Sequence, residues 1–332
     1  MRSRLPLTLA VTLLASAGLA GLAPASATAA TTASQRWKAS AAGGWFAWGS
    51  PVIGDVNNDG SNDVVVGGQD GGVYAYSADG NLLWRGQAAA AVASTPAIGD
   101  VDGDGRNEVV VGTGGLDAGA FNGTKGALDI FDSNGARRCE FVLPTPYGPN
   151  SLVTGSPSIG DVNGDGVNDI VFGSHNTTIY VADGHCNTIA TFNNRDSVFS
   201  TPALYDADRS GQLDIFIGGD ATANGAVAGD SFNGGIFRRL HYNGSGTLAQ
   251  VWHRDAVNGE AFQSGAAIGD ITGDGVPEVV TGSGAFYCQV KHLCAESNKV
   301  WAMNLANGGD VPGWPKRTMP NEIMRSVPSS CR

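Results

Sequence analysis

The chain has 332 residues, of which 49 are glycine, and its formal net charge is −11 at pH 7. Acidic residues outnumber lysine and arginine by 31 to 20, and no basic stripe exists, which argues against nucleic acid as a partner. Beyond residue 22 no stretch is long and apolar enough to span a membrane, so an integral membrane protein is not expected.

The N-terminus has the pattern of a secretory signal peptide over residues 1–27. Arg2 and Arg4 precede an apolar run over residues 5–22, and the small residues Ala-Ser-Ala at 25–27 form a cleavage site. No cysteine follows the apolar run directly, which argues against a lipid anchor. We therefore expect a secreted, extracellular protein without a membrane span.

A nine-residue frame that begins with aspartate recurs five times along the chain. The copies are residues 55–63, 100–108, 161–169, 206–214 and 270–278. Most odd positions carry an oxygen-bearing side chain, position 6 is always glycine, and position 9 is always an acid. Alternating oxygens and a glycine at the sharp turn are typical of a loop that wraps Ca²⁺, in which position 7 binds through its backbone carbonyl. Solvated turns are the alternative, but turns without a chemical demand would not keep this frame five times.

The frame predicts five calcium sites as the cofactor centres of this protein. Zinc is disfavoured because no Cys or His lies in any frame, and a strand-like apolar run follows each frame where an EF-hand would need Glu and a helix. Ser210 and Thr272 replace stronger ligands in the fourth and fifth loops, so we expect weaker binding there. The predicted ligands are Asp55, Asn57, Asp59, Ser61, Asp63, Asp100, Asp102, Asp104, Arg106, Glu108, Asp161, Asn163, Asp165, Val167, Asp169, Asp206, Asp208, Ser210, Gln212, Asp214, Asp270, Thr272, Asp274, Val276 and Glu278.

The spacing of the frames predicts an all-β protein. Successive first aspartates lie 45, 61, 45 and 64 residues apart, and periods near 40–50 residues with insertions indicate propeller blades. In the first unit, residues 50–56, 63–68, 72–78 and 82–87 read as strands A to D, with the calcium loop as the A–B turn. We expect a β-propeller of four-stranded antiparallel blades that start near residues 49, 94, 155, 200 and 264, within a domain of residues 28–332.

This pattern resembles the FG-GAP and VCBS repeat family, whose propellers include the head of integrin α subunits. The resemblance covers residues 49–317 and depends on the frame and its trailing strand. It implies calcium in the A–B turns. Residues 73–84 also resemble a hairpin of quinoprotein propellers, but those lack the calcium frame, so no quinone cofactor is expected.

The two ends of the chain resemble parts of further blades. Residues 35–44 resemble another strand D, and residues 325–330 resemble the start of another strand A, a partial blade from residue 325. Because propellers protect their edges by closing, this pattern predicts a chain truncated from a longer propeller, for example a seven-bladed one. An open arc of five blades is favoured, and a closed five-bladed ring is the alternative.

Five cysteines lie beyond the signal peptide, and export permits disulfide bonds. The short separation of Cys288 and Cys294 favours a bond between them. A bond between Cys139 and Cys186 is also possible, and Cys331 is left unpaired.

Alternating strand directions place the calcium loops on one face of the propeller, together with the C–D turns. The long insertions at residues 114–126, 143–155, 220–235 and 282–298 then lie on the other face, where recognition is expected. The candidate aromatic residues on this face are either recognition residues or packing residues between blades: Phe121, Tyr147, Phe232, Phe262, Phe286 and Tyr287.

No catalytic constellation is supported by the sequence. It contains neither Gly-x-Ser-x-Gly nor His-Glu-x-x-His, and its five histidines are scattered singly. The expected function is therefore a secreted calcium-binding module that binds carbohydrate or protein. A lyase-like enzyme acting on polysaccharide and a structural spacer within a longer secreted protein are the alternatives.

Overall fold

The computed structural model describes residues 34–40, 46, 48–114, 126–144, 151–220, 234–256, 260–284 and 298–317. The chain divides into two compact units, Met1–Arg36 and Trp37–Arg332, and the fold described below is that of the second unit. None of the described residues forms a helix that is long and apolar enough to cross a membrane.

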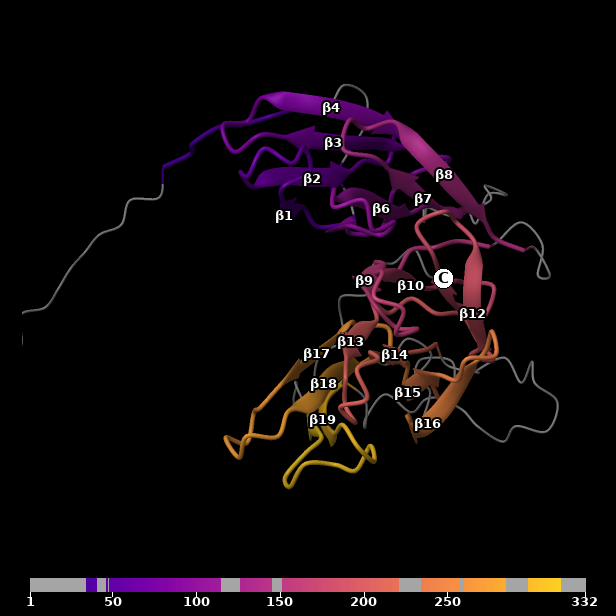
Figure 1. Ribbon diagram of the computed structural model, residues 1–332. Coiled ribbons are helices and arrows are strands. Elements are labelled where there is room, and N and C mark those ends of the chain that lie inside the picture. Colours follow the sequence, from indigo (N-terminus) through magenta and orange to yellow (C-terminus); the bar gives the residue numbers. More distant parts are fainter. Residues whose placement is uncertain are drawn as a thin grey trace, which may run out of the picture. The chain divides into compact units, whose positions relative to one another are not determined.

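The described part of the second unit consists of five four-stranded antiparallel sheets, which confirms the prediction of five all-β blades (Figure 1). In each sheet the strands lie in chain order, so that neighbouring strands are joined by hairpins. The strands are β1 (Val52–Gly54), β2 (Asp63–Gly67), β3 (Gly72–Tyr76), β4 (Leu82–Gln87), β5 (Ala97–Gly99), β6 (Glu108–Gly112), β7 (Ala127–Phe131), β8 (Arg137–Val142), β9 (Ser158–Gly160), β10 (Asp169–Gly173), β11 (Thr178–Ala182), β12 (Thr188–Asn193), β13 (Ala203–Tyr205), β14 (Asp214–Gly218), β15 (Ile236–Tyr242), β16 (Leu248–Asp255), β17 (Ala266–Gly269), β18 (Glu278–Ser283), β19 (Lys299–Asn304) and β20 (Lys316–Arg317).

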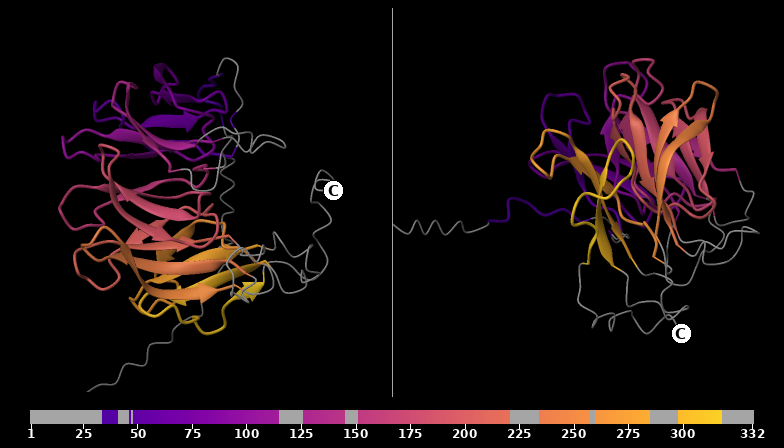
Figure 2. Two further views of the ribbon diagram at one scale, coloured as in Figure 1. Left: turned by 90° about the vertical axis from the view of Figure 1, so that its right-hand side faces the viewer. Right: turned by 90° about the horizontal axis from the view of Figure 1, so that it is seen from below.

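The hydrophobic core lies between consecutive sheets. The second strand of each sheet is rich in Val, Ile and Phe, and β6, β10 and β14 are buried over their whole length. One core cluster joins Val110 and Leu128 of the second sheet to Phe172 and Tyr180 of the third. Similar clusters join the first sheet to the second, the third to the fourth and the fourth to the fifth, in the order in which the sheets follow along the chain (Figure 2). The open arc of blades stays a prediction.

Neighbouring blades are also linked where a strand D passes the C–D turn of the next blade. The Trp84 ring of β4 lies so close to Gly135 that an added Cβ would come within 2.6 Å of it, and Trp252 of β16 lies on Gly308 in the same way, with 2.7 Å. Each indole therefore packs on a glycine that has a positive φ. Trp37 covers Gly80 similarly and donates to the carbonyl of Ala78 (3.0 Å), so this part of the predicted N-terminal strand D makes the contact expected of it, although no strand is assigned over residues 34–40.

A disulfide bond takes the place of this contact between the second and third blades. Cys139 lies opposite Ile130 in the ladder, as Trp84 lies opposite Ala75, and it is bonded to Cys186 in the turn after β11. The bond that the sequence favoured less is thus the one that the structure contains. The favoured pair, Cys288 and Cys294, and Cys331 lie outside the described residues.

The five acidic loops and the C–D turns share one face, as predicted. An added Cβ at Gly184, in the C–D turn of the third sheet, would lie 2.2 Å from the carbonyl oxygen of Val101 in the second loop. Two of the insertions meet each other, because Gly126 N donates to Ser151 O (2.6 Å). The end of a third insertion meets the segment before the fifth sheet, because Gly235 N donates to Glu260 O (2.7 Å).

One of the candidate recognition aromatics is a core residue. Phe262 is fully buried, and its ring centroid lies 5.6 Å from those of both Phe237 and Trp301. Packing between the fourth and fifth sheets therefore accounts for it. Phe121, Tyr147, Phe232, Phe286 and Tyr287 lie outside the described residues, as does the partial blade predicted from residue 325.

Candidate metal centres

Each of the five frames forms the turn between the first two strands of a sheet. The first aspartate directly follows the short first strand at the edge of the sheet. The acid at position 9 begins the buried second strand. We number the loops one to five in chain order. The predicted ligands of each loop are therefore brought together by a single turn.

The glycine at position 6 is required by its backbone conformation and not by a lack of room for a side chain. Its φ lies between +82° and +90° in all five loops, and nothing lies within 4 Å of an added Cβ at Gly60, Gly105, Gly166, Gly211 or Gly275. A side chain would fit there, but its backbone would be strained in this conformation.

Position 4 also has a positive φ in every loop, which the sequence analysis missed. The residues are Asn58, Gly103, Gly164, Arg209 and Gly273, with φ between +60° and +79°. Asn and Gly adopt this conformation most readily, so their recurrence at position 4 was a usable signal. Arg209 is the exception.

Backbone N–H groups fix the carboxylate at position 1 in the same way in all five loops. The position-6 glycine donates to its Oδ2 atom over 2.8–2.9 Å in each copy. In loop three the Oδ1 atom of Asp161 also accepts from Gly164 N at 2.6 Å. The loop thus holds this side chain in one orientation, and the remaining lone pairs of its oxygens are available to a cation.

Position 5 is oriented by the N–H of position 7. The distances are 2.8 Å to Asp59, 2.8 Å to Asp104, 2.9 Å to Asp165 and 2.8 Å to Asp274. In loop four the acceptor is the Ser210 hydroxyl, at 3.3 Å. Four loops therefore present an oriented carboxylate here, and the fourth does not.

The acid at position 9 is buried in every loop. Its carboxylate accepts the N–H of position 2, for example from Val162 to Asp169 over 2.9 Å and from Val101 to Glu108 over 3.1 Å. Burial raises the pKa of Asp169 to about 6 and raises the pKa of Asp63 and Glu108 as well. A carboxylate removed from water gains more from a nearby cation than an exposed one does.

Loops one and three fit a hard cation. In loop three the Asn163 amide donates to Asp165 Oδ2 (2.9 Å), which holds positions 3 and 5 together, and Asn57 does the same with Asp59 in loop one (3.0 Å). Carboxylate, amide and carbonyl oxygens are the ligands that Ca²⁺ prefers. Loop five has the same arrangement at positions 1, 5 and 9, but its Thr272 hydroxyl donates to Glu278 Oε1 (3.3 Å).

Loop two contains both a converging acid cluster and a competing arginine. Oxygens of Asp100, Asp102 and Glu108 all lie within 4.8 Å of one another. The Arg138 guanidinium from β8 pairs with Asp102 and lies 3.5 Å from Glu108. The Arg138 side chain is 32% exposed, so it borders solvent.

In loop four a positively charged side chain, that of Arg239, lies against the acids. The Arg239 Nη2 atom lies 2.8 Å from Asp214 Oδ2 and 3.4 Å from Asp208 Oδ2, and its side chain is 5% exposed. His241 Nδ1 lies 3.0 Å from the other oxygen of Asp214. The buried guanidinium lies beside the acids at positions 3 and 9 and repels a metal ion. Loop four therefore does not fit calcium as the other loops do.

Sequence reasoning missed Arg138, Arg239 and His241 as neighbours of the loops. A signal for the last two was present: the third strand of the fourth sheet reads Ile-Phe-Arg-Arg-Leu-His-Tyr, whereas the third strands of the first and third sheets are apolar. Buried arginines require hydrogen-bond acceptors, which Arg239 finds in acids and Arg238 finds in the amide oxygens of Asn194 and Gln250. The identity of the partner, 25 residues away, could not be read from that pattern.

Comparison with known proteins agrees with this fold. Residues 55–111 and 100–172 match the model of the FG-GAP-like repeat. The C-terminal domain of PilY1 from Pseudomonas aeruginosa is 15% identical with a TM-score of 0.55, and the match covers 79% of this chain and 71% of that one. No curated protein sequence matches the chain.

A second solved structure with a similar fold is an enzyme. A quinohemoprotein alcohol dehydrogenase from Pseudomonas putida HK5 is 15% identical with a TM-score of 0.51. The match covers 82% of this chain but 42% of that one, so this chain spans less than half of the enzyme's length. At such identities the likeness shows a β-propeller fold alone.

Proposed function

Residues 55–172 belong to the FG-GAP-like repeat family, and from this premise we propose that the protein is an exported, calcium-stabilised β-propeller that acts as a binding module for carbohydrate or protein. One observation carries the calcium part of the proposal. In loops one, two, three and five the carboxylates at positions 1 and 5 are both held by backbone N–H groups, as in a prearranged ligand set.

Four of the five loops are proposed to bind calcium. Loop one would use Asp55, Asn57, Asp59, the carbonyl of Ser61 and Asp63. Loops two, three and five would use the equivalent positions, with Arg138 leaving loop two. Calcium would supply the charge that the buried position-9 acid lacks and would join the loop to the second strand of its sheet. Loop four would keep Arg239 in this role.

Export is supported by two independent features. The first 27 residues have the pattern of a signal peptide, and Cys139 is bonded to Cys186 in the folded unit. Stable disulfide bonds are typical of oxidising compartments outside the cytosol.

A binding role is supported by the arrangement of the scaffold. Rigid sheets carry long connecting segments, which is the usual organisation of recognition proteins. A glycan array and a panel of extracellular proteins, probed with the mature chain in calcium buffer, test this part. Reproducible binding to at least one ligand is expected, and a chain that binds none of them would contradict it.

Calorimetric titration of the metal-free protein with Ca²⁺ tests the metal part. We expect four equivalents for the wild type. Asp161→Ala in loop three should bind one equivalent less, whereas its matched variant Asp206→Ala in loop four should bind as many as the wild type. Less than one equivalent bound by folded wild-type protein would refute the proposal.

A further inference from the structure

Successive loops are joined by hydrogen bonds to the carbonyl oxygen of the first aspartate. Asn107, at position 8 of loop two, donates to Asp55 O over 2.8 Å, and Asn168 of loop three donates to Asp100 O over 2.8 Å. In loop four the backbone N–H of Leu213 donates to Asp161 O over 3.1 Å. The first three junctions between loops are therefore closed by a donor at position 8.

The junction between loops four and five lacks this donor. Position 8 of loop five is Pro277, which has neither a backbone N–H nor a polar side chain. The hydrogen bond that closes the other junctions cannot form here.

A second departure from the repeat lies on the other side of the same junction. The residue before the first aspartate is glycine in four loops, and in loops one to three this glycine lies against the next sheet. An added Cβ at Gly54 would come within 3.1 Å of Ile98, and one at Gly160 within 2.6 Å of Leu213. In the fourth sheet this residue is Tyr205, which is 38% exposed. A tyrosine side chain cannot pack against the next sheet in the way that these glycines do.

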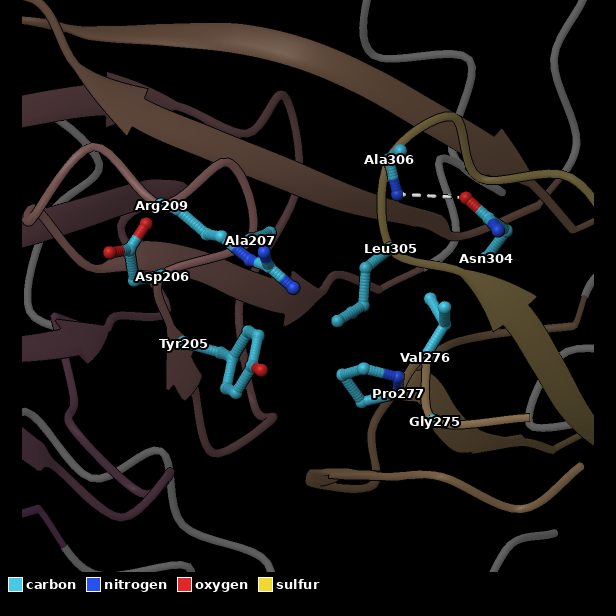
Figure 3. A pocket seen from close by; sticks show the side chains of 10 residues that line it. All are labelled: Tyr205, Asp206, Ala207, Arg209, Gly275, Val276, Pro277, Asn304, Leu305 and Ala306. Carbon is cyan, nitrogen blue, oxygen red and sulfur yellow. Dashed lines mark hydrogen bonds between the residues drawn. The ribbon is translucent and has the colours of Figure 1, made fainter. Parts of the chain in front are cut away.

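The result is a pocket of about 130 Å³ between loops four and five. Its walls also include the turn after β19, where Leu305 contributes an apolar surface (Figure 3). Two more departures line it: Ala207 at position 2, where other loops have Val or Ile, and Arg209 at position 4. Four positions that differ from the repeat therefore meet in one cavity.

The pocket combines apolar rings with a positive charge. In Figure 3 the rings of Tyr205 and Pro277 lie on opposite sides of the cavity, and the Arg209 side chain extends from loop four towards Leu305. No described residue pairs with the Arg209 guanidinium. The carboxylate of Asp206 is occupied by the N–H groups of Ser210 and Gly211, both at 2.9 Å.

The Leu305 wall is held in place by two buried donors behind it. The carbonyl oxygen of Leu305 accepts from Trp252 Nε1 at 2.8 Å and from Arg239 Nη1 at 3.4 Å. Both donor side chains are buried. The pocket is thus supported by the same arginine that holds loop four, and its wall does not depend on a metal ion in that loop.

We propose that this pocket binds a carboxylate-bearing sugar residue, the uronate unit of an acidic polysaccharide. The Tyr205 ring would stack on the apolar face of the sugar, and Arg209 would pair with its carboxylate. A cavity of about 150 Å³ takes a benzene ring. A pocket of about 130 Å³ would therefore take one face or edge of a single sugar unit and not a whole unit. The proposal rests on the binding role proposed above and names its ligand class. It places the site on the face of the five acidic loops and not on the face of the long connecting segments.

Titration calorimetry with trigalacturonate, maltotriose and a short polyglutamate peptide tests the proposal. We expect trigalacturonate to bind and the neutral sugar and the acidic peptide to bind at least tenfold more weakly. Arg209→Gly and Tyr205→Gly should each weaken trigalacturonate binding at least tenfold. Glycine stands at the position of Tyr205 in all four other loops and at the position of Arg209 in three of them. Both variants should therefore fold, with an unchanged calcium count.

Asn58→Gly in loop one is the matched control and should leave trigalacturonate binding unchanged. Unaltered binding by Arg209→Gly, no binding of trigalacturonate by the wild type, or equal binding of polyglutamate would each overturn the proposal. These outcomes are separate from failure of the calcium proposal, which would show as an absence of bound Ca²⁺ in the metal titration.

Discussion

Loops three and four share one frame and touch each other, yet they neutralise their buried acids differently. Gln212 Nε2 of loop four donates to Asn163 O of loop three over 2.7 Å. Asp169 and Asp214 are equally buried at position 9, with 2% and 0% exposure. Asp169 is met by backbone N–H groups, whereas Asp214 is also met by the Arg239 guanidinium at 2.8 Å.

The difference teaches that the frame specifies a need for positive charge and does not specify its source. In loop three no described cationic side chain pairs with the acid, and we propose that a calcium ion from solution supplies the charge. In loop four a strand of the same sheet supplies it. The lost carboxylate at position 5, Ser210, is consistent with a loop that has no metal ion to hold.

Removal of calcium should give the largest difference in stability between loops three and four. Each site contributes roughly 2.7 kcal/mol at a ligand concentration of 100 times Kd, so chelation should lower Tm by on the order of 10 °C or more. Hydrogen exchange should increase at residues 161–169 and stay unchanged at residues 206–214. Equal loss of protection in both loops would break the comparison.

Removal of the guanidinium should destabilise loop four. Arg239→Met leaves Asp214 buried beside His241 alone, and loss of one partner of a buried ion pair costs about 3–5 kcal/mol. Chemical denaturation in chelator should show this loss, and calcium should restore part of it.

Arg138→Met, which removes the guanidinium beside loop two, is the control for that variant. The Arg138 side chain is about one-third exposed, so a loss of less than about 1 kcal/mol is expected. A similar loss in both variants would contradict the distinction between a fixed and a movable arginine.

Asp129 is a buried acid outside the loops, and it should make the unfolding free energy depend on pH. Asp129 in β7 is fully buried and accepts from Ala89 N at 2.7 Å, while the more exposed Arg137 lies 3.5 Å away. Burial raises the pKa of Asp129 to about 6, above its ordinary value near 4. Between these values the folded protein holds a proton that the unfolded chain has lost. The stabilisation by this group is therefore full at pH 4 and lost as pH rises through 6.

Asp129→Asn should flatten this part of the pH profile. The difference in unfolding free energy between pH 4.5 and pH 7 should shrink by on the order of 2 kcal/mol in denaturation experiments. The matched control is Asp79→Asn, which changes an exposed acid and should leave the profile as it is in the wild type. A profile in Asp129→Asn identical to that of the wild type would show that the acid is not kept protonated by burial.

The smallest effect concerns the position-6 glycines of the two loops. Gly166 and Gly211 have φ of +87° and +90°, and a Cβ meets no atom within 4 Å at either position. Alanine should therefore cost about 1–2 kcal/mol in both loops through backbone strain alone. Gly166→Ala should also remove or weaken one calcium site, whereas Gly211→Ala should leave the calcium count unchanged. A reduced count in Gly211→Ala would show that loop four binds calcium.

The repeat determined the architecture because its information is local. Five frames, each followed by a Val- or Ile-rich run, were enough to predict five antiparallel sheets with the loops in the first turns. The oxygen spacing, the glycine at position 6 and the acid at position 9 are all contained within nine residues. For the same reason the positive φ at position 4 could have been predicted from its Asn and Gly residues.

Contacts between distant segments were decided by the tertiary structure. The frame spacing does not reveal that Arg239 enters loop four, that Asn107 reaches the carbonyl of Asp55, or that Cys139 meets Cys186. These pairs depend on how the strands and neighbouring sheets pack, and packing combines residues that lie 25 to 52 positions apart. The sequence by itself determined which segments form loops and strands and where charge is needed. Which loop receives that charge from the protein, and which junction stays open as a pocket, was set by the tertiary fold, because both depend on side chains contributed by other strands and sheets.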